Sequence, residues 1–170
     1  MLDTKSVHID RIESITEGRV WTGGLYDCFG ILGYFEGKEP LLSLGHHLAD
    51  KPREILEKWQ ELKDVVEDCR YGKIVIVRVD EPYPEGFVEV NGKRLNYIER
   101  FREVVAGLRK QHPRAQIVEA SYERGAGTAF SADTATLKWY LKKDRKPVEK
   151  YGFLRPMHQK QSARRVSRAR

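Results

Sequence analysis

The segments CFGILGYF (residues 28–35) and LLSLGHHL (residues 41–48) carry the pattern that decides the fold. Both are almost continuous in apolar and small residues, as strands covered on both faces are. The polar segment EGKEP (residues 36–40) lies between them and is typical of a turn. The pattern predicts a β-hairpin, and the open end of that hairpin brings Cys28 and His46 close together.

A cysteine and a histidine at the open end of one hairpin suggest a nucleophile and its base. A free thiol has a pKa of about 8.5, so it needs a neighbouring imidazole to react as a thiolate at neutral pH. The glycines before Cys28 leave the backbone open to a ligand. The structural alternative is a buried core cysteine, which is a common role for this residue. A zinc site formed by Cys28, His46 and His47 is a third interpretation, without supporting ligand spacing.

Strand alternation decides which neighbours can face the thiol. Adjacent residues of a strand point to opposite faces, so only one of the two histidines can serve Cys28. We expect His46 to do so and His47 to be a supporting or surface residue. The same alternation predicts that Asp27 points away from Cys28. Cys69 falls on the apolar stripe of a predicted helix, and we interpret it as a core residue.

Length and composition indicate one folded domain. The chain has 170 residues, 40% of them hydrophobic, which is enough to bury a core without disulfides or a metal. The first ten residues lack the apolar segment of a signal peptide, and no later run approaches membrane-spanning length. We therefore expect a cytoplasmic protein with no membrane insertion and with both cysteines as thiols.

The net charge of +6 belongs to the end of the chain. Residues 155–170 contain six Lys or Arg residues and no Asp or Glu. We divide the chain into a single α+β domain with the Cys–His site, residues 1–154, and a basic C-terminal tail, residues 155–170, which we expect to be disordered. The tail is either a contact for an acidic partner or nucleic acid, or a solvated extension.

The remaining patterns complete the fold prediction. Two amphipathic helices are expected, one from an N-cap at Asp50 to Cys69 with a stop at Gly72, and one behind the capping pair Asn96 and Glu99. The predicted order of elements is strands, helix, strands, helix, strands. This order indicates an α+β layered sandwich with mixed, mostly antiparallel β-sheets and two main helices. Strands are expected at 7–15, 19–22, 28–35, 41–48 and 73–79, around the Asn91-Gly92 turn, and as a final pair at 116–123 and 128–142.

Thr22 stands six residues before Cys28 across a glycine-containing turn, and His46 follows Leu-Ser-Leu-Gly at the end of its strand. With the closing strands of residues 115–141, this layout resembles the CheD family of chemotaxis-receptor glutamine deamidases. That family shares its fold and its cysteine–histidine site with the deamidase domain of cytotoxic necrotizing factor toxins. The resemblance covers residues 18–142. One departure is that the family usually has a small residue before the cysteine, where this chain has Tyr26-Asp27.

The resemblance implies a cysteine-dependent amidohydrolase that deamidates an exposed glutamine of a protein substrate. Cys28 would attack the carboxamide, His46 would carry the proton, and Thr22 would orient the imidazole. Backbone N–H groups of the turn at Gly24, Tyr26 and Asp27 would bind the oxyanion and substrate. No metal or cofactor is required. The alternatives are a transglutaminase-like transferase, and a non-catalytic adaptor or nucleic-acid-binding protein that uses the basic tail.

Overall fold

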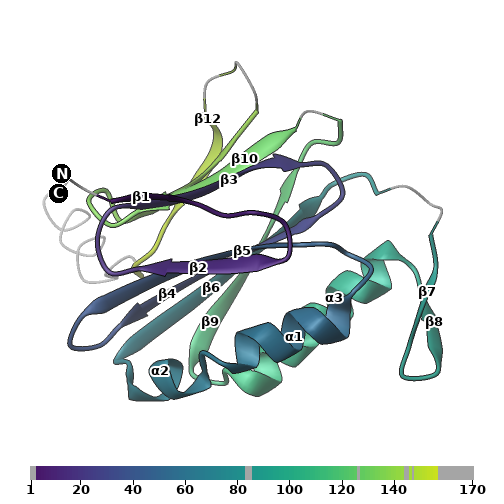
Figure 1. Ribbon diagram of the computed structural model, residues 1–170, viewed down its shortest axis with the longest axis horizontal. Coiled ribbons are helices and arrows are strands. Elements are labelled where there is room, and N and C mark those ends of the chain that lie inside the picture. Colours follow the sequence, from purple (N-terminus) through teal and green to yellow (C-terminus); the bar gives the residue numbers. More distant parts are fainter. Residues whose placement is uncertain (1–2, 83–85, 126, 144–145, 147, 157–170) are drawn as a thin grey trace, which may run out of the picture.

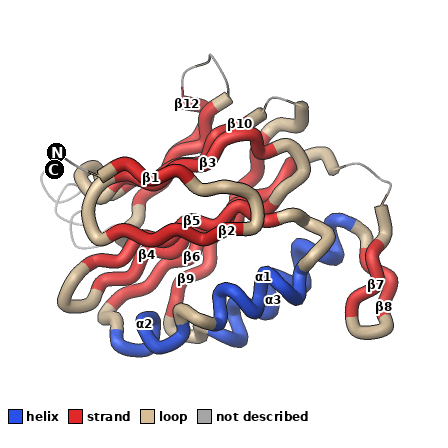
Figure 2. Tube along the Cα trace, viewed as in Figure 1, coloured by secondary structure: helices blue, strands red, loops and turns tan. Residues whose placement is uncertain are grey.

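The computed structural model describes residues 3–82, 86–125, 127–143, 146 and 148–156. In these residues the chain forms a mixed α+β structure of twelve strands and three helices. Figure 1 shows three layers: one five-stranded sheet, a second five-stranded sheet, and the helices on the outer face of the second sheet. The same layering is visible in Figure 2, where all helices lie on one side. The predicted tail falls at 155–170, and its residues 157–170 lie outside the described part.

The first sheet, which we call sheet A, is formed by the N-terminal strands and the C-terminal part of the described chain. Its order is β1-β3-β10-β11-β12, with β1 parallel to β3 and the other pairs antiparallel. Its strands are β1 (Thr4–Ser6), β3 (Arg19–Leu25), β10 (Thr128–Asp133), β11 (Lys138–Lys142) and β12 (Val148–Phe153).

The second sheet, sheet B, is built around the predicted hairpin. Its order is β2-β5-β4-β6-β9, and only β6 and β9 are parallel. The hairpin is confirmed, since β4 pairs with β5 from Phe29 opposite His47 to Glu36 opposite Pro40. The strands are β2 (Arg11–Ile15), β4 (Phe29–Glu36), β5 (Pro40–His47), β6 (Tyr71–Val79) and β9 (Ala115–Tyr122).

Strand β4 is buried because both of its faces are covered. Phe29 packs toward the helices, with its ring centroid 5.2 Å from Tyr97 and 5.5 Å from Phe101. Gly30 faces sheet A, where an added Cβ would lie 2.7 Å from the Phe130 ring. A side chain at this position would therefore push the two sheets apart, and glycine permits their close approach. Sequence reasoning correctly identified this strand as covered on both sides.

The second predicted helix is confirmed together with its cap. Helix α3 (Tyr97–Gln111) begins after Asn96, whose side chain accepts a 3.0 Å hydrogen bond from the Glu99 N–H. The Glu99 carboxylate accepts the Asn96 N–H at 2.8 Å. The short hairpin of β7 (Val88–Val90) and β8 (Lys93–Leu95) turns at Asn91 and Gly92, which have φ values of 52° and 77° as a type I′ turn requires.

The first predicted helix is divided in two. Helix α1 (Pro52–Gln60) ends before Glu61, and helix α2 (Lys63–Asp68) follows. The N-cap of α1 is Lys51 and not Asp50, and Gly72 belongs to β6 rather than to a helix stop. The Trp59 carbonyl accepts from the Leu62 N–H and lies 3.1 Å from His112 Nε2. These contacts tighten the chain at the end of α1 and terminate it.

Two strand predictions were wrong, one in its bounds and one in its pairing. The strand expected at 7–15 is shorter: only residues 11–15 form a strand, β2 in sheet B, after a turn at Asp10 with φ 61°, and β1 lies before the predicted range, in sheet A. The strands expected to pair at 116–123 and 128–142 lie in different sheets, because β9 joins β6 in sheet B. The segment 128–142 is itself a hairpin of β10 and β11. Strand β3 also continues through Gly23 and Gly24 instead of ending there.

Candidate functional site

Thr22 and His46 meet between the two sheets. Thr22 lies on β3 of sheet A and His46 on β5 of sheet B, and their side chains are joined by a 2.7 Å contact between Thr22 Oγ1 and His46 Nδ1. Both residues are buried, with 1% and 2% of their surfaces exposed. The predicted partnership of these two residues is therefore present in the structure, and the packing of sheet A on sheet B creates it.

A count of protons assigns the tautomer of His46. Thr22 Oγ1 is also 2.8 Å from the carbonyl oxygen of Val7, which can only accept a hydrogen bond. The single hydroxyl proton of Thr22 is donated to that carbonyl. The contact with His46 is then a hydrogen bond only if Nδ1–H of the imidazole donates to Thr22. His46 is therefore assigned as the Nδ1–H tautomer, with a lone pair on Nε2.

The Nε2 atom of His46 is buried and has no hydrogen-bond partner among the described residues. Burial lowers the pKa of His46 below its usual value, so the ring is neutral at pH 7. A buried acceptor without a partner is uncommon, and such groups often have a catalytic role. The free nitrogen is the one that a general base requires.

Cys28 lies at the mouth of the hairpin, one residue before β4. The residue two positions later, Gly30, pairs with His46, so the register places Cys28 diagonally across from His46 on the adjacent strand. Cys28 is 9% exposed, and its carbonyl accepts a 2.6 Å hydrogen bond from the Tyr122 hydroxyl. Because Nδ1 of His46 binds Thr22 and Nε2 has no partner, neither nitrogen is hydrogen-bonded to the thiol.

The electrostatic surroundings keep the Cys28 thiol protonated. Burial raises the pKa of Cys28 to about 11, and the negative charges of Asp27 and Asp10 act in the same direction. The sequence-based expectation that Asp27 points away from the thiol was wrong. Alternation does not apply here because both residues precede β4. The thiol can react at neutral pH only if a base takes its proton during the attack.

A pocket of about 280 Å³ opens onto Cys28. Tyr97 and Arg100 of α3 contribute to its wall, together with the segment between β5 and α1. Of the predicted substrate-binding residues, Asp27 lines this pocket, whereas Tyr26 is exposed and, like Gly24, is absent from the lining. The described lining residues are Asp27, Cys28, Leu48, Ala49, Asp50, Tyr97 and Arg100.

Arg100 is a site residue that sequence reasoning missed. It is 7% exposed, donates a 2.6 Å hydrogen bond to the Gly86 carbonyl, and leaves its Nε buried without a partner. The available signal was its position, because Arg100 lies three residues after Tyr97 and four before Val104 on the buried face of α3. A charged residue on such a face indicates a functional contact or a paired charge.

Asp10 holds the end of β5 in place beside the site. Its N–H donates to the His46 carbonyl at 2.7 Å, and its carbonyl accepts from Lys58 Nζ at 2.6 Å. Its carboxylate lies 3.9 Å from Lys51 Nζ. The charge of Asp10 influences the pKa values of both Cys28 and His46, which places these three residues in one neighbourhood.

His47 occupies the opposite face of β5. Trp59 Nε1–H of α1 donates to His47 Nε2 at 2.9 Å, and His47 is fully buried. Burial lowers the pKa of His47 to about 3. The structure thus gives His47 a supporting role between sheet B and the helices.

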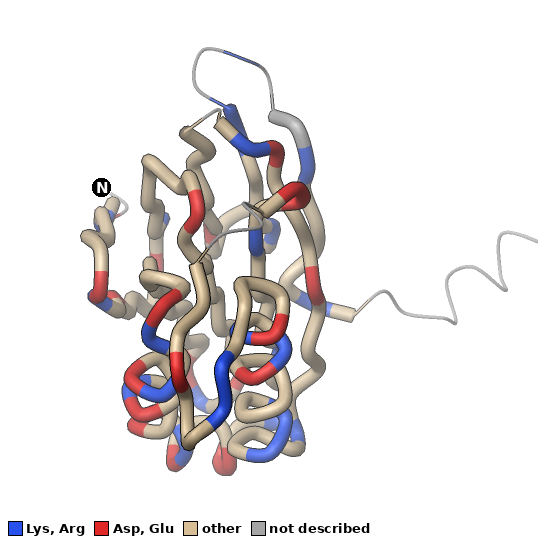
Figure 3. Tube along the Cα trace, turned by 90° about the vertical axis from the view of Figure 1, so that its right-hand side faces the viewer, with Lys and Arg blue, Asp and Glu red and all other residues tan. Residues whose placement is uncertain are grey.

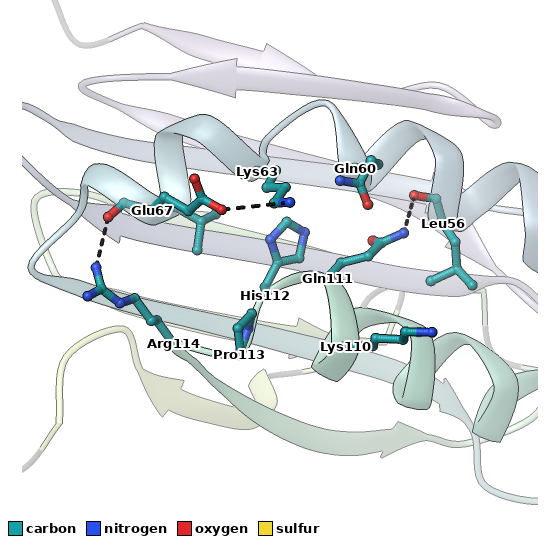
Figure 4. Close-up of a pocket in the computed structure, with 11 residues that line it drawn as sticks. Leu56, Gln60, Lys63, Glu67, Lys110, Gln111, His112, Pro113 and Arg114 are labelled. Atoms are coloured by element: carbon teal, nitrogen blue, oxygen red, sulfur yellow. Dashed lines mark hydrogen bonds and ion pairs between the residues drawn. The ribbon is translucent and has the colours of Figure 1, made fainter.

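A larger cavity of about 800 Å³ lies in the helical layer, between the α1–α2 segment and the C-terminal end of α3 (Figure 4). Lys63 pairs with Glu67 at its edge, and Gln111 donates to the Leu56 carbonyl at 2.9 Å. Its lining contains neither a cysteine nor a serine or threonine hydroxyl. The smaller pocket differs from this cavity in having the Cys28 thiol in its lining, although His46 is not among its described lining residues.

Within the described residues, no group of three or more His, Cys, Asp or Glu side chains is arranged to hold a metal ion. The described part of the chain also contains no helix long and apolar enough to cross a membrane. Comparison with models of protein families finds no match, and comparison with curated proteins likewise finds none.

Proposed function

We propose that this protein is a cysteine-dependent amidohydrolase that deamidates glutamine side chains of a protein substrate, as its resemblance to the CheD family implies. The observation that carries the proposal is the hydrogen-bonded Thr22–His46 pair, which leaves the His46 Nε2 without a partner on the strand that pairs with the strand following Cys28. A nucleophile, a neutral base and a group that orients the base are the three parts of this chemistry.

In the first half of the proposed reaction, the sulfur of Cys28 attacks the carboxamide carbon. His46 Nε2 takes the thiol proton as the C–S bond forms, which gives a tetrahedral oxyanion and an imidazolium held by Thr22. When the C–N bond breaks, the same proton passes to the leaving nitrogen. Ammonia departs and a thioester remains on Cys28.

In the second half, water hydrolyses the thioester. His46 Nε2 removes a proton from the water, whose oxygen bonds to the acyl carbon. The C–S bond then breaks and the imidazolium returns its proton to the sulfur. The products are a glutamate side chain and the free thiol, so the cycle needs no other reactant.

The pocket beside Cys28 would accommodate one side chain of the substrate. Arg100 lines this pocket, and its guanidinium would donate to a carbonyl oxygen of the substrate. Backbone N–H groups around Cys28 would stabilise the oxyanion, and each such donor is typically worth about 3 kcal/mol. The raised pKa of Cys28 fits a resting state of neutral thiol and neutral imidazole, in which the proton moves during attack.

The direct test is ammonia release from glutamine-containing probes. Casein and a blocked glutaminyl-glycine dipeptide supply accessible carboxamides, and the release of ammonia is measured with glutamate dehydrogenase. The wild-type chain should release ammonia, and the Cys28→Ser variant should not. The Cys69→Ser variant is the matched control and should retain the activity. Equal activity of wild-type protein and Cys28→Ser would contradict the proposal.

The transglutaminase alternative differs only in the acceptor of the acyl group. A fluorescent primary amine added to the same assay would be incorporated into casein by a transferase, whereas a hydrolase converts the glutamine to glutamate. The mass of the modified peptide distinguishes the two products.

A further inference from the structure

The outer face of sheet A is not covered by the helices, which all lie against sheet B (Figures 1 and 2). Three aromatic side chains on this face are exposed to solvent: Trp21 is 42% exposed, Tyr151 58% and Phe153 42%. Exposed aromatic residues gathered on one face of a monomeric protein commonly mark a binding surface.

The strand register arranges this face in rows across the sheet. Residues at paired positions on neighbouring strands share a face and lie about 5 Å apart. One row combines aromatic rings with hydroxyl groups, and the next contains most of the charges. The aromatic row is Ser6, Trp21, Ser131, Tyr140 and Tyr151, and the charged row is Thr4, Arg19, Asp133, Lys138 and Phe153.

Lysine side chains lie close to the aromatic rings of this face. Lys138 Nζ lies 5.0 Å from the centroid of the Tyr151 ring and 5.4 Å from that of Phe153. Tyr151 and Phe153 are themselves 6.2 Å apart in an edge-to-face arrangement. Lys142 adds a further cation at the exposed end of β11. Asp133 is the one acidic side chain in these two rows, and it is 3.9 Å from Arg19 Nε.

The segment that follows β12 in sequence is positively charged, like the outer face of sheet A. Strand β12 carries Tyr151 and Phe153, and the chain continues directly into residues 155–170 with six Lys or Arg residues and no acid. The helical layer differs, because acidic and basic residues are interspersed there (Figure 3). Aromatic rings, cations and a basic extension at the same end of the chain are complementary to an anionic polymer with flat rings.

We infer that the outer face of sheet A binds single-stranded RNA. Unpaired bases stack on Trp21, Tyr140 and Tyr151, and phosphates are paired with Lys138 and Lys142. Trp21 and Tyr151 are three strands apart, or about 14 Å, which leaves room for more than one nucleotide between them. The hydroxyls of Ser6 and Ser131 in the aromatic row can bond to ribose 2′-hydroxyl groups, which DNA lacks.

The test is the fluorescence anisotropy of a labelled single-stranded RNA of mixed sequence, about 12 nucleotides long, titrated with the full chain. Trp21→Ala and Tyr151→Ala should each raise the Kd by about tenfold, since each removes a stacking ring. Phe87→Ala is the matched control. Its ring is 53% exposed with Arg94 4.3 Å above it, but it lies outside sheet A. Folding of each variant is checked by circular dichroism.

Charge and sugar preference give two further readouts. Lys138→Gln should reduce the slope of log Kd against log salt by about one, whereas Lys110→Gln in α3 should not change it. DNA of the same sequence should bind more weakly than RNA, and tighter binding of DNA would contradict the assignment to RNA. Cys28→Ser should leave RNA binding unchanged. RNA binding can therefore be tested independently of the proposed enzyme activity.

Two results would overturn the inference. Unchanged affinity in both Trp21→Ala and Tyr151→Ala would show that the basic tail alone holds the RNA. Sedimentation that shows a dimer dissociated by Tyr151→Ala, with no RNA binding, would identify the face as an interface between two copies of the chain.

Discussion

His46 and His47 are neighbours in sequence, yet they occupy two different layers of the molecule. Trp59 donates to Nε2 of His47, so that nitrogen carries no proton and is already engaged. Nδ1 of His46 is held by Thr22, and Nε2 remains free. Both rings are neutral and share one tautomer, but only His46 has a lone pair that no described group engages. Each ring leaves one buried nitrogen without a partner, but in His47 it is the protonated Nδ1 and in His46 it is the Nε2 that carries the lone pair. That difference, rather than burial or a missing partner alone, distinguishes the candidate base from the structural histidine.

Replacing His46 and His47 one at a time should give the largest difference in ammonia release between two variants. His46→Ala should lower ammonia release on the order of 10³-fold, because general base catalysis is lost. His47→Gln, whose side-chain oxygen can still accept from Trp59, should retain activity within a few-fold. The measurement is the rate per folded protein, with folding checked by circular dichroism. If His47→Gln were the more damaging change, the assignment of roles would be reversed.

Stability should depend on pH through the buried His47. Its pKa falls from 6.5 to about 3 on folding, so below pH 6.5 the unfolded chain binds a proton that the folded chain does not. Stability should therefore be lost as the pH falls from 6.5 toward 3, by several kcal/mol in total. Urea unfolding at a series of pH values measures this slope.

The His47→Gln variant is the control for that measurement. It removes this titrating group and should flatten the decline of stability below pH 6.5. His46 and His112 also have lowered pKa values because of burial, so part of the slope should remain. A slope identical to that of the wild-type protein would contradict a buried neutral His47.

The hydrogen bond between Thr22 and His46 can be tested without replacing His46. Thr22→Val removes the acceptor of the Nδ1–H, so the imidazole loses its fixed tautomer, and activity should fall about 10- to 100-fold. Thr22→Ser keeps the hydroxyl and should retain most of the activity. A pH profile of the rate distinguishes the loss of orientation from a packing defect. Equal rates in Thr22→Val and wild type would remove Thr22 from the mechanism.

The smallest expected effect is that of the Asp27 carboxylate on the reactivity of the Cys28 thiol. Asp27 contributes to the raised pKa of Cys28, so Asp27→Asn should lower that pKa and speed alkylation by iodoacetamide at about pH 8 by roughly threefold. The rate in wild-type protein should climb with pH up to about 11, as the thiolate forms. The experiment uses a Cys69→Ser background so that one thiol reacts. A slower reaction of Asp27→Asn would contradict this sign.

The fold and the site could be predicted from sequence where local patterns specify them. The β4–β5 hairpin followed from two apolar runs around a polar turn, and the α3 cap from Asn96 and Glu99. The break after α1 depends on Trp59, whose carbonyl meets His112 from a distant part of the chain. No local pattern reveals such a contact.

Sheet membership was also beyond local reasoning. The segment between β9 and β10 contains glycines typical of a hairpin turn, but it connects two different sheets. In the site, strand alternation correctly separated His46 from His47 and failed for Asp27, which lies before the strand begins. Arg100 was missed, although its position between Tyr97 and Val104 on the buried face of α3 was a signal in the sequence.

The tautomer of His46 tests the central claim most directly. Long-range proton–nitrogen correlation spectra of protein labelled with isotope-enriched histidine report which ring nitrogen carries the proton, and His46→Gln identifies the His46 signals. The account predicts a proton on Nδ1 and a lone pair on Nε2 at about pH 7. A proton on Nε2 of His46 would contradict it, because the ring could then not take the proton of Cys28.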